Sequence, residues 1–508
     1  MITIFRKQQM GIIQRQSVKS SLVNFTGFLV GSLSTLFILP LDWNLYGSIQ
    51  YWLAIAMLLS PFLNLGTVAL VEKYFPFFKE RNIPGFLRFI FLVTIIATGF
   101  SLLLLFFLGD YLIKWLSPIM ELTSSTNENI FIISVAILIG FINLVRVQSA
   151  NFQRIVFFDI IYKLGFKFFL PFIFLLHLWH LLQTEELQVG IVLFYALVLL
   201  VLIFYLKKIG AWDVKTNNAI RVAQTKKKEY SSYMFFSMFN EVSHLMAYKI
   251  DIIMIGALLS KTSAGIFSSF LFLSAILEIP SRSLYEISAP FIASSFEKND
   301  MNKVEELYKK SSINLMIVGV FIFCIIWLNI ENVFDIMTNG KDLRPFKWIF
   351  VFLGVAKLID MLTSLNKHIL IYSKHYMFNL YFVVALAVLN IGANYIMIGQ
   401  WGILGAGLAT AISIFIFQLG RTFYIYLKMK IHPFNNKSLQ LLFIIAVVLL
   451  VSPAVHRLDC NIFLQGGFIT LGFSFLYFIA LRKLQISDEI ENMLLSKLPM
   501  LKPWLGKD

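Results

Sequence analysis

The stretch Gln188–Leu206, QVGIVLFYALVLLVLIFYL, carries no charged side chain, and Lys207 and Lys208 follow it directly. The hydrocarbon core of a bilayer is about 30 Å thick, so a membrane-spanning helix needs roughly 20 predominantly apolar residues. This stretch is long enough and apolar enough to meet that requirement. It therefore predicts a helix that crosses a membrane and ends at a pair of basic residues.

Comparable stretches recur along the whole chain. The sequence is 58% hydrophobic and 14% charged, whereas a soluble domain carries about 25% charged residues. The candidate spans lie near 20–40, 45–70, 87–108, 130–150, 160–181, 188–206, 232–259, 264–290, 312–330, 346–369, 376–398, 402–428, 438–456 and 463–481. The sequence therefore predicts an all-α polytopic membrane protein with about 14 transmembrane helices.

The basic residues lie on alternate sides of these spans. If the N-terminus is cytoplasmic, the great majority of the 43 Lys and Arg residues fall in cytoplasmic segments, as the positive-inside rule requires. The opposite loops hold Lys114, Lys261, Lys341, Arg344, Lys347 and Arg457. This pattern predicts a multi-pass protein of the cytoplasmic (inner) membrane with both termini inside. The net charge of +15 then reflects inner loops that face anionic lipid head groups, and no nucleic acid is expected as a partner.

Other functional classes lack their sequence signals. The longest gaps between spans, near 207–231 and 291–311, are too short to fold as domains. No Walker-type phosphate loop, HExxH motif, nucleophile elbow or Cys/His cluster occurs in the sequence. Cys324 and Cys460 are the two cysteines, and they indicate neither a disulfide nor a metal site. We therefore expect no enzymatic activity, no cofactor and no metal.

One inner gap has a helical pattern of its own. In Glu297–Lys310, EKNDMNKVEELYKK, Asn299 or Asp300 can cap a helix, and Glu305 and Glu306 lie at helical spacing from the two following lysines. This segment predicts a short surface helix.

Polar residues inside the spans are the candidate binding residues, because a charge at mid-bilayer costs about 2.5–3.5 kcal/mol on insertion scales. The clearest set lies in the segment 232–259 and consists of Ser237, Glu241, His244, Tyr248 and Asp251. Their spacing places them within roughly an 80° arc of a helix. The stripe is either a water-exposed helix face that lines a passage or a buried structural network between packed helices.

Two further spans carry polar faces. The first has a small, polar face that includes Asn24, which is typical either of close helix packing or of cavity lining. The segment 346–369 carries Lys357 and Asp360 one helical turn apart. These two residues are either an internal ion pair or part of a polar cavity.

The remaining charged candidates lie nearer the predicted inner side. Glu278 and Arg282 are four residues apart and are expected to pair. Arg146 and Arg421 lie toward the inner ends of the fourth and twelfth spans. For both, anchoring at the membrane interface is the simpler interpretation.

The chain also repeats itself. The spans at 20–70 resemble those at 232–290, because each pair has a striped helix, a glycine in the outer turn (Gly47 or Gly265) and a later mid-span proline. This predicts a domain order of 1–210 (N-terminal lobe, spans 1 to 6), 211–230 (cytoplasmic linker), 231–430 (C-terminal lobe, spans 7 to 12) and 431–508 (two extra spans and a cytoplasmic tail). Repeats of this kind are typical of transporters whose site lies between the halves.

Local motifs resemble a known family. Lys249–Gly256, KIDIIMIG, and Ser263–Ser268, SAGIFS, are similar to segments of the Wzx-type oligosaccharide (polysaccharide) flippases, which share a superfamily with the multidrug and toxin extrusion (MATE) transporters. Leu65-Gly66, Lys73–Pro76 and Ala289-Pro290 also fit. The resemblance covers essentially the whole chain. It implies two pseudo-symmetric six-helix lobes in a V-shaped bundle, with a cavity lined by the first, second, seventh and eighth helices.

The same resemblance implies a function. The expected activity is to move an isoprenoid-pyrophosphate-linked oligosaccharide from the inner to the outer leaflet, for the synthesis of cell-surface polysaccharide. Arg282, Lys357 and Arg421 would then offset the pyrophosphate charge. Family members often have cationic cavities, whereas the stripe here carries Glu241 and Asp251. With His244, these carboxylates could instead bind a coupling proton or sodium ion.

Two alternatives remain. One is a cation-coupled small-molecule or drug antiporter of the same superfamily, and such antiporters usually stop at twelve spans. The other is a membrane-embedded glycosyltransferase or polymerase, which the short loops disfavour.

Overall fold

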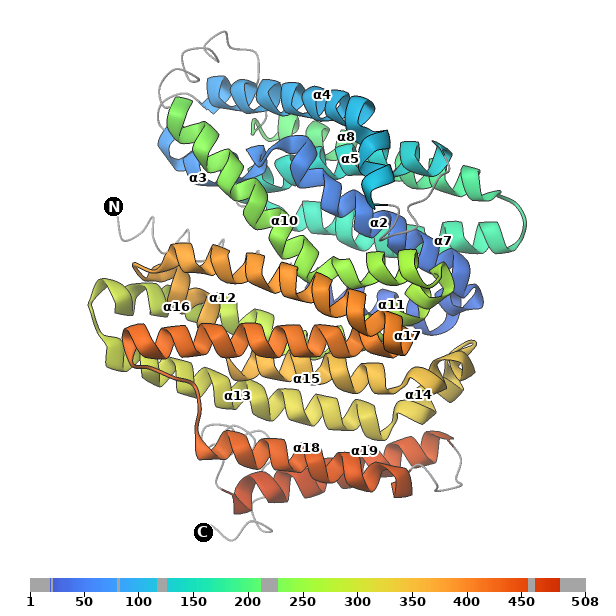
Figure 1. Ribbon diagram of the computed structural model, residues 1–508, viewed down its shortest axis with the longest axis vertical. Coiled ribbons are helices and arrows are strands. Elements are labelled where there is room, and N and C mark those ends of the chain that lie inside the picture. Colours follow the sequence, from blue (N-terminus) through green and yellow to red (C-terminus); the bar gives the residue numbers. More distant parts are fainter. Residues whose placement is uncertain are drawn as a thin grey trace. The chain divides into compact units, whose positions relative to one another are not determined.

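The computed structural model describes residues 19, 22–79, 83–116, 126–152, 154–211, 227–455 and 462–484. These residues form helices and their connections, and none of them lies in a strand (Figure 1). Contacts between helices divide the chain into two compact units, Met1–Gly265 (unit 1) and Ile266–Asp508 (unit 2). The predicted all-α polytopic fold is confirmed.

The spans can be counted among the described helices by length and composition. Among the described residues, 10 helices are long and apolar enough to cross a membrane, and α15 (Trp348–Leu362) with α16 (Asn366–Tyr372) makes an eleventh if this pair, bent by 43°, counts as one span. The helix α17 (Tyr376–Met429) is itself two helices joined at Gly402. The total of fourteen stays a prediction.

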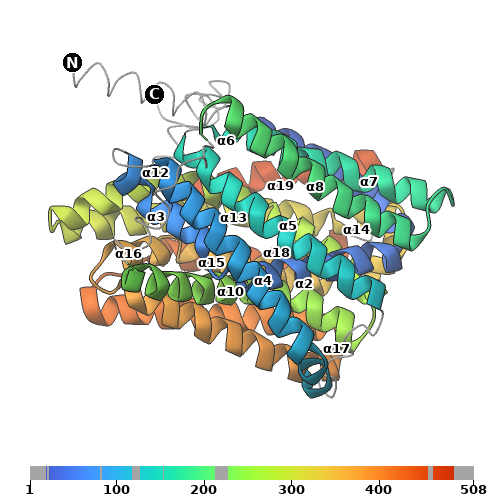
Figure 2. The same cartoon turned by 90° about the horizontal axis from the view of Figure 1, so that it is seen from above.

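Unit 1 is built around α5. Its elements are the first helix (Leu22–Leu41, which includes η1 Ser34–Ile38 and η2 Leu39–Leu41), α2 (Trp43–Asn64), α3 (Thr67–Lys79), α4 (Ile83–Leu116), α5 (Thr126–Asn151), α6 (Ile155–Phe158), η3 (Asp159–Leu164), α7 (Gly165–Leu178), α8 (Thr184–Lys208) and α10 (Lys227–Leu258). The helix α5 packs against α2, α3 and α8, and Figure 2 shows it running beside α8. The helix α10, which contains the predicted seventh span, packs against α2 and α3. The predicted lobes, 1–210 and 231–430, stay a prediction.

The helix α2 crosses the start of α11 (Lys261–Ala275) at two glycines. A Cβ added to Gly47 would lie 1.7 Å from the carbonyl oxygen of Lys261 and 2.6 Å from the amide nitrogen of Gly265. A Cβ added to Gly265 would lie 2.3 Å from the carbonyl oxygen of Trp43. The two helices therefore approach backbone to backbone, which only glycine permits. The two glycines that the sequence pairs as equivalent positions of the repeat are in contact.

Unit 2 is built around α13 and α17. Its elements are α12 (Glu278–Glu297), α13 (Met301–Leu328), α14 (Ile330–Ile336), η4 (Gly340–Phe346), α15, α16, α17, α18 (Asn436–Val455) and α19 (Ile462–Lys483). The helix α13 packs against α12, α15, α18 and α19, while α15 and α16 pack against α17. Figure 1 shows α13, α15 and α17 running side by side, with α18 and α19 beyond α13.

A one-residue turn joins the two halves of α17. Gly402 has φ 57° and ψ −135°, a conformation that residues with a Cβ avoid. The halves then run so close together that a Cβ on Gly405 would lie 1.9 Å from the carbonyl oxygen of Met397.

The start of α13 tests the helix predicted in the inner gap. The Asp300 carboxylate accepts a hydrogen bond from the Lys303 amide at 3.0 Å, so the predicted cap is confirmed. The predicted pairs also form, at 2.6 Å for Lys309–Glu305 and 3.1 Å for Lys310–Glu306. The expectation of a separate short helix is wrong. Neither Pro nor Gly separates Lys310 from the next apolar run, so the helix continues to Leu328.

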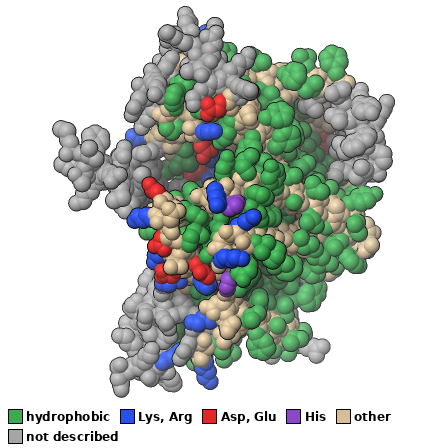
Figure 3. Space-filling model, turned by 60° about the vertical axis from the view of Figure 1, so that its left-hand side comes forward, with side chains coloured by type: hydrophobic (Ala, Val, Ile, Leu, Met, Phe, Trp, Pro, Cys, Tyr) green, Lys and Arg blue, Asp and Glu red, His purple; other side chains and the backbone are tan. Residues whose placement is uncertain are grey.

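Charges at the predicted outer side are paired. Glu331 binds Lys347 at 2.6 Å and Arg344 at 3.4 Å, and Arg344 also pairs with Asp335. Two of the few basic residues predicted outside are thus paired with carboxylates. Figure 3 brings forward the opposite, left-hand side of Figure 1, where Lys and Arg side chains lie among Asp and Glu side chains and hydrophobic side chains cover much of the remaining described surface.

Candidate functional site

A group of polar and charged side chains lies among the membrane helices of unit 2. Its members come from α12, α13, α15, α16 and α17 and are joined by hydrogen bonds or ion pairs. We call them the unit 2 network: Glu278, Tyr308, Lys357, Asp360, Asn366, Asn379, Gln418, Arg421 and Thr422.

An ion pair between Lys357 and Glu278 forms one part of the network. The Lys357 ammonium on α15 pairs with the Glu278 carboxylate on α12, and their side chains are only 16% and 28% exposed. One turn further along α15, Asp360 accepts a hydrogen bond from the side-chain amide of Gln418. The charge of Lys357 also acts on Asp360. Lys357 and Asp360 therefore share one polar environment, but each also binds a side chain from another helix.

Asn366 connects the middle of the network. Its amide nitrogen donates to Gln418 Oε1 at 3.2 Å and to Thr422 Oγ1 at 2.9 Å, and its carbonyl oxygen accepts from the Tyr308 hydroxyl. Asn366 is 1% exposed and Tyr308 is fully buried. A buried amide is costly unless its donors and acceptor are used, and here they are. Tyr308 also belongs to the apolar cluster that packs α12, α13, α16 and α17 together.

Arg421 lies inside unit 2 rather than at an exposed interface. Only 5% of the residue is exposed. Its guanidinium donates to Asn379 Oδ1 at 2.9 Å, lies 4.8 Å from the centre of the Phe417 ring, and acts electrostatically on Asp360. A buried guanidinium needs such partners, because an unpaired buried charge is strongly destabilising. The interpretation of Arg421 as an interfacial anchor does not fit this position.

The four charged members balance one another. Glu278, Lys357, Asp360 and Arg421, all candidates from the sequence, are brought together from three helices. Two carboxylates face two cations, so the loss or gain of one charge leaves the network unbalanced. An anion that binds a cation, or a cation that binds a carboxylate, would therefore have to displace a partner already present.

A second candidate surface follows α10 in unit 1. His244 and Tyr248 are exposed with ring centres 4.9 Å apart, Ser237 and Glu241 are half-buried, and Asp251 is 2% exposed. The charge of Arg146 on α5 acts on Glu241. The stripe is thus accessible along much of its length and closed at its Asp251 end.

The other sequence candidates lie apart from these groups. Asn24 is exposed on the first helix of unit 1. Arg282 belongs to α12, but its side chain lies outside the described part of the structure. Within the described ranges, no group of three or more His, Cys, Asp or Glu residues could hold a metal ion.

Sequence reasoning missed the neutral members of the network, which are Tyr308, Asn366, Asn379, Gln418 and Thr422. A signal for two of them was present. Gln418 lies three residues before Arg421 and four before Thr422 in one apolar span, so it lies on the helix face of each. The contribution of Tyr308 and Asn366 depends on contacts between helices that no local pattern reports.

Cysteine labelling tests the accessibility of α10. After replacement of Cys324 and Cys460, cysteine at 244 or 248 should react readily with a membrane-impermeant thiol reagent, whereas cysteine at 251 should react at least about ten-fold more slowly, because reaction needs an exposed thiolate. Positions 242 and 253, which are 5% and 4% exposed, are the matched buried controls. If cysteine at 244 reacts as slowly as cysteine at 242, the stripe does not face water.

The structure resembles two solved transporters. One is a lipid II flippase, MurJ, in an inward closed conformation, with a TM-score of 0.66 and 13% sequence identity, covering 92% of this chain and 99% of that chain. The other is an inward-facing multidrug resistance MATE family transporter of the MOP superfamily, with a TM-score of 0.61 and 11% identity, covering 80% of this chain and 94% of that chain. No protein-family model and no curated protein sequence matches the chain. Its fold is therefore the one shared by this lipid II flippase and this MOP-superfamily transporter.

Proposed function

We propose that this protein is a flippase for a lipid-linked oligosaccharide. The substrate is an oligosaccharide on an isoprenoid pyrophosphate, moved from the inner to the outer leaflet of the cytoplasmic membrane for the synthesis of cell-surface polysaccharide. The observation that carries the proposal is the unit 2 network, because charged groups that are placed among membrane helices at such cost usually mark a substrate or ion pathway. The likeness in fold to a lipid II flippase over 92% of the chain supports it.

The physical task explains why a polar interior is needed. A glycan head cannot dissolve in hydrocarbon, because each unmet hydroxyl would lose its hydrogen bonds to water. It needs a hydrated passage, while the lipid tail can stay in the bilayer beside the protein. Alternating access, in which one repeat rocks against the other, would open that passage to each leaflet in turn.

The charged pair gives a way to couple the substrate to an ion. A pyrophosphate that binds Lys357 displaces Glu278 from it, with Arg282 and Arg421 as further cations for the phosphates. Glu278, left without its cation, then takes up a proton or a sodium ion, because an uncompensated charge in this position is too costly. Glu241, His244 and Asp251 on α10 form a second set of groups that could carry the coupling ion.

A small-molecule antiporter is the second candidate function. The MATE transporter has a comparable fold, but the match covers 80% of this chain against 92% for the flippase. The sequence also predicts two further spans at 431–508, which an antiporter of twelve spans does not need.

Depletion of the protein in its native cell tests the proposal. A lipid-linked glycan should accumulate several-fold, and the accumulated glycan should be accessible only from the cytoplasmic side, because the carrier is still loaded but no longer flipped. Expression of the wild-type protein should reverse this, and a variant with Lys357→Ala at equal membrane abundance should not. Unchanged glycan levels together with increased sensitivity to toxic cations would favour the antiporter.

A further inference from the structure

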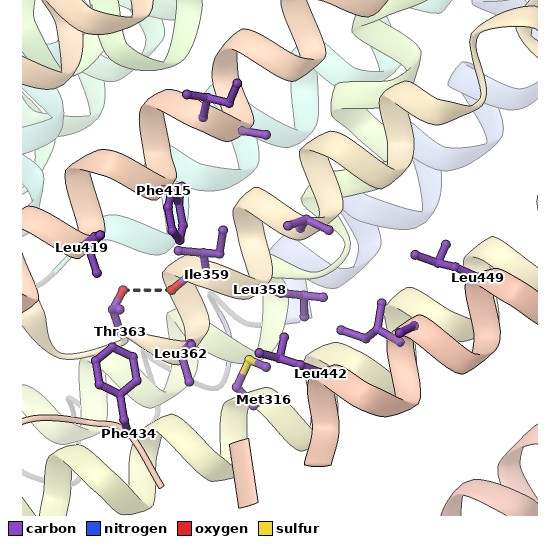
Figure 4. A pocket seen from close by; sticks show the side chains of 15 residues that line it. Met316, Leu358, Ile359, Leu362, Thr363, Phe415, Leu419, Phe434, Leu442 and Leu449 are labelled. Carbon is purple, nitrogen blue, oxygen red and sulfur yellow. Dashed lines mark hydrogen bonds between the residues drawn. The ribbon is translucent and has the colours of Figure 1, made fainter. Parts of the chain in front are cut away.

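A cavity of about 510 Å³ lies within unit 2, among α13, α15, α17, α18 and the chain before α18 (Figure 4). Pockets that hold small ligands span roughly 300–1,000 Å³. Thr363 is the one polar side chain among the residues that line the cavity. Its hydroxyl donates to the Ile359 carbonyl at 2.9 Å, as Figure 4 shows, so it needs no partner in the cavity. The cavity is therefore suited to hydrocarbon.

The cavity opens toward the surface along α17 and α18. Four large apolar lining residues remain 50%, 50%, 43% and 41% exposed, namely Phe415, Leu419, Phe434 and Leu442. Along α17 the lining runs from Ala411 to Leu419, about 12 Å at 1.5 Å per residue. One leaflet of the hydrocarbon core is about 15 Å deep. A chain that lies along a single leaflet would thus match the length of the cavity.

One end of the cavity meets a basic connection. Phe434 belongs to the residues that join α17 to α18, and the ring of His432 stacks beside it with centroids 6.3 Å apart. Lys430 precedes these rings, and Lys437 lies in the first turn of α18. The free amides at the start of α18 add a partial positive charge.

No acidic residue offsets this charge in the sequence around it. Between Asp360 and Asp459 the chain contains no Asp or Glu. The connection 430–435 also belongs to the segment that the charge pattern places on the cytoplasmic side, where the leaflet is rich in anionic lipids.

We propose that the cavity holds one acyl chain of an anionic glycerophospholipid, with its phosphate bound by Lys430, His432 and Lys437. The apolar lining takes the chain, the length of the cavity matches one leaflet, and the basic connection selects a negatively charged head group. An unbranched acyl chain fills a cavity of this volume more readily than a long, methyl-branched isoprenoid does. The bound lipid is therefore distinct from the proposed transport substrate, and its test does not depend on that function.

Native mass spectrometry of the purified full chain tests the site. Phosphatidylglycerol and phosphatidylethanolamine with the same acyl chains are added separately, and the apparent Kd for the first bound lipid is measured. Wild-type protein should prefer phosphatidylglycerol. The double substitution Lys430→Gln and Lys437→Gln should weaken phosphatidylglycerol binding roughly twenty-five-fold, from about five-fold for each lost charge. It should weaken phosphatidylethanolamine binding clearly less, because the ammonium of that head group offsets the charge of its phosphate.

Matched variants separate the site from general effects. Lys303→Gln with Lys310→Gln removes the same charge from the exposed face of α13 and should leave binding unchanged. Ala446→Trp fills the cavity and should abolish tight binding, whereas Val447→Trp, on the adjacent exposed position of α18, should not.

Several results would overturn the proposal. These are equal affinity for the two phospholipids, equal loss of binding in the α13 variant, and full binding by the Ala446→Trp protein. Displacement of phosphatidylglycerol by an equimolar isoprenoid phosphate would assign the cavity to the tail of that lipid instead.

Discussion

Replacing Gly47 with alanine is expected to destabilise the protein severely. The new methyl group would lie 1.7 Å from the carbonyl oxygen of Lys261 and 2.6 Å from the nitrogen of Gly265. Both are backbone atoms, so no side-chain rotation can relieve the overlap and α2 has to move away from α11. Overpacking costs about 3 kcal/mol at the upper end of its usual range. We expect a thermal midpoint well below that of the wild-type protein in detergent, and little monodisperse material.

Two other glycine substitutions serve as comparisons for Gly47→Ala. Gly265→Ala should behave in the same way, since its methyl group would lie 2.3 Å from the Trp43 carbonyl oxygen. Gly392→Ala on α17 meets nothing within 4 Å, so it should be neutral or gain up to about 1 kcal/mol from the better helix propensity of alanine. Wild-type stability of the Gly47→Ala protein would show that α2 and α11 do not cross this closely.

Replacing Lys357 with alanine should impair both stability and transport. Removal of one member of a buried ion pair costs about 3–5 kcal/mol, because the other charge is left uncompensated. Glu278 is 28% exposed, so water relieves part of that cost and the lower end of the range applies. Transport of the lipid-linked glycan should fall at least about ten-fold, a loss of 1.4 kcal/mol or more in transition-state binding. Lys357→Arg should recover part of the activity, since it keeps the charge but changes its geometry.

A double variant separates the two effects. Glu278→Gln combined with Lys357→Ala removes both charges and should restore much of the thermal stability without restoring transport. Lys303→Ala is the matched control, because its partner Glu306 is exposed and exposed ion pairs contribute little to stability. If export by the Lys357→Ala protein equals that of the wild type at normal membrane abundance, Lys357 has no part in the site.

The sequence predicts well the features that depend on neighbouring residues, and less well those that depend on contacts between distant segments. Apolar runs such as Gln188–Leu206 predict their helices directly, because a span is a local property of composition. The helix pattern in Glu297–Lys310 predicts a cap at Asn299 or Asp300, and Asp300 provides it, but the pattern does not predict that the helix joins the following span. A helix continues from a loop into a span where no helix-breaking residue lies between them. The absence of such a residue is a weaker signal than the presence of a Pro or Gly.

The candidate site shows the same limit. Glu278, Lys357, Asp360 and Arg421 can be found from the sequence, because charges in apolar runs are conspicuous. Their partners cannot, because Lys357 binds a residue of another helix although Asp360 is one turn away. Helical spacing indicates pairs within one helix, whereas the positions of α12 and α15 in the folded unit decide which charges meet. Asn366 lies next to the bend between α15 and α16 and is conspicuous only once α13 and α17 are placed around it.

The turn at Gly402 bears on how the chain enters the membrane during synthesis. Because the two halves of α17 run in opposite directions from Gly402 (Figure 1), almost no chain is left on the far side to be translocated separately. The two halves should insert together as a hairpin, and the first half cannot settle in the bilayer before the second has left the ribosome. A nascent chain arrested shortly after Gly402 would therefore expose an unfinished membrane element to proteases at the insertion site, and an epitope tag placed in this turn would hinder biogenesis rather than report topology.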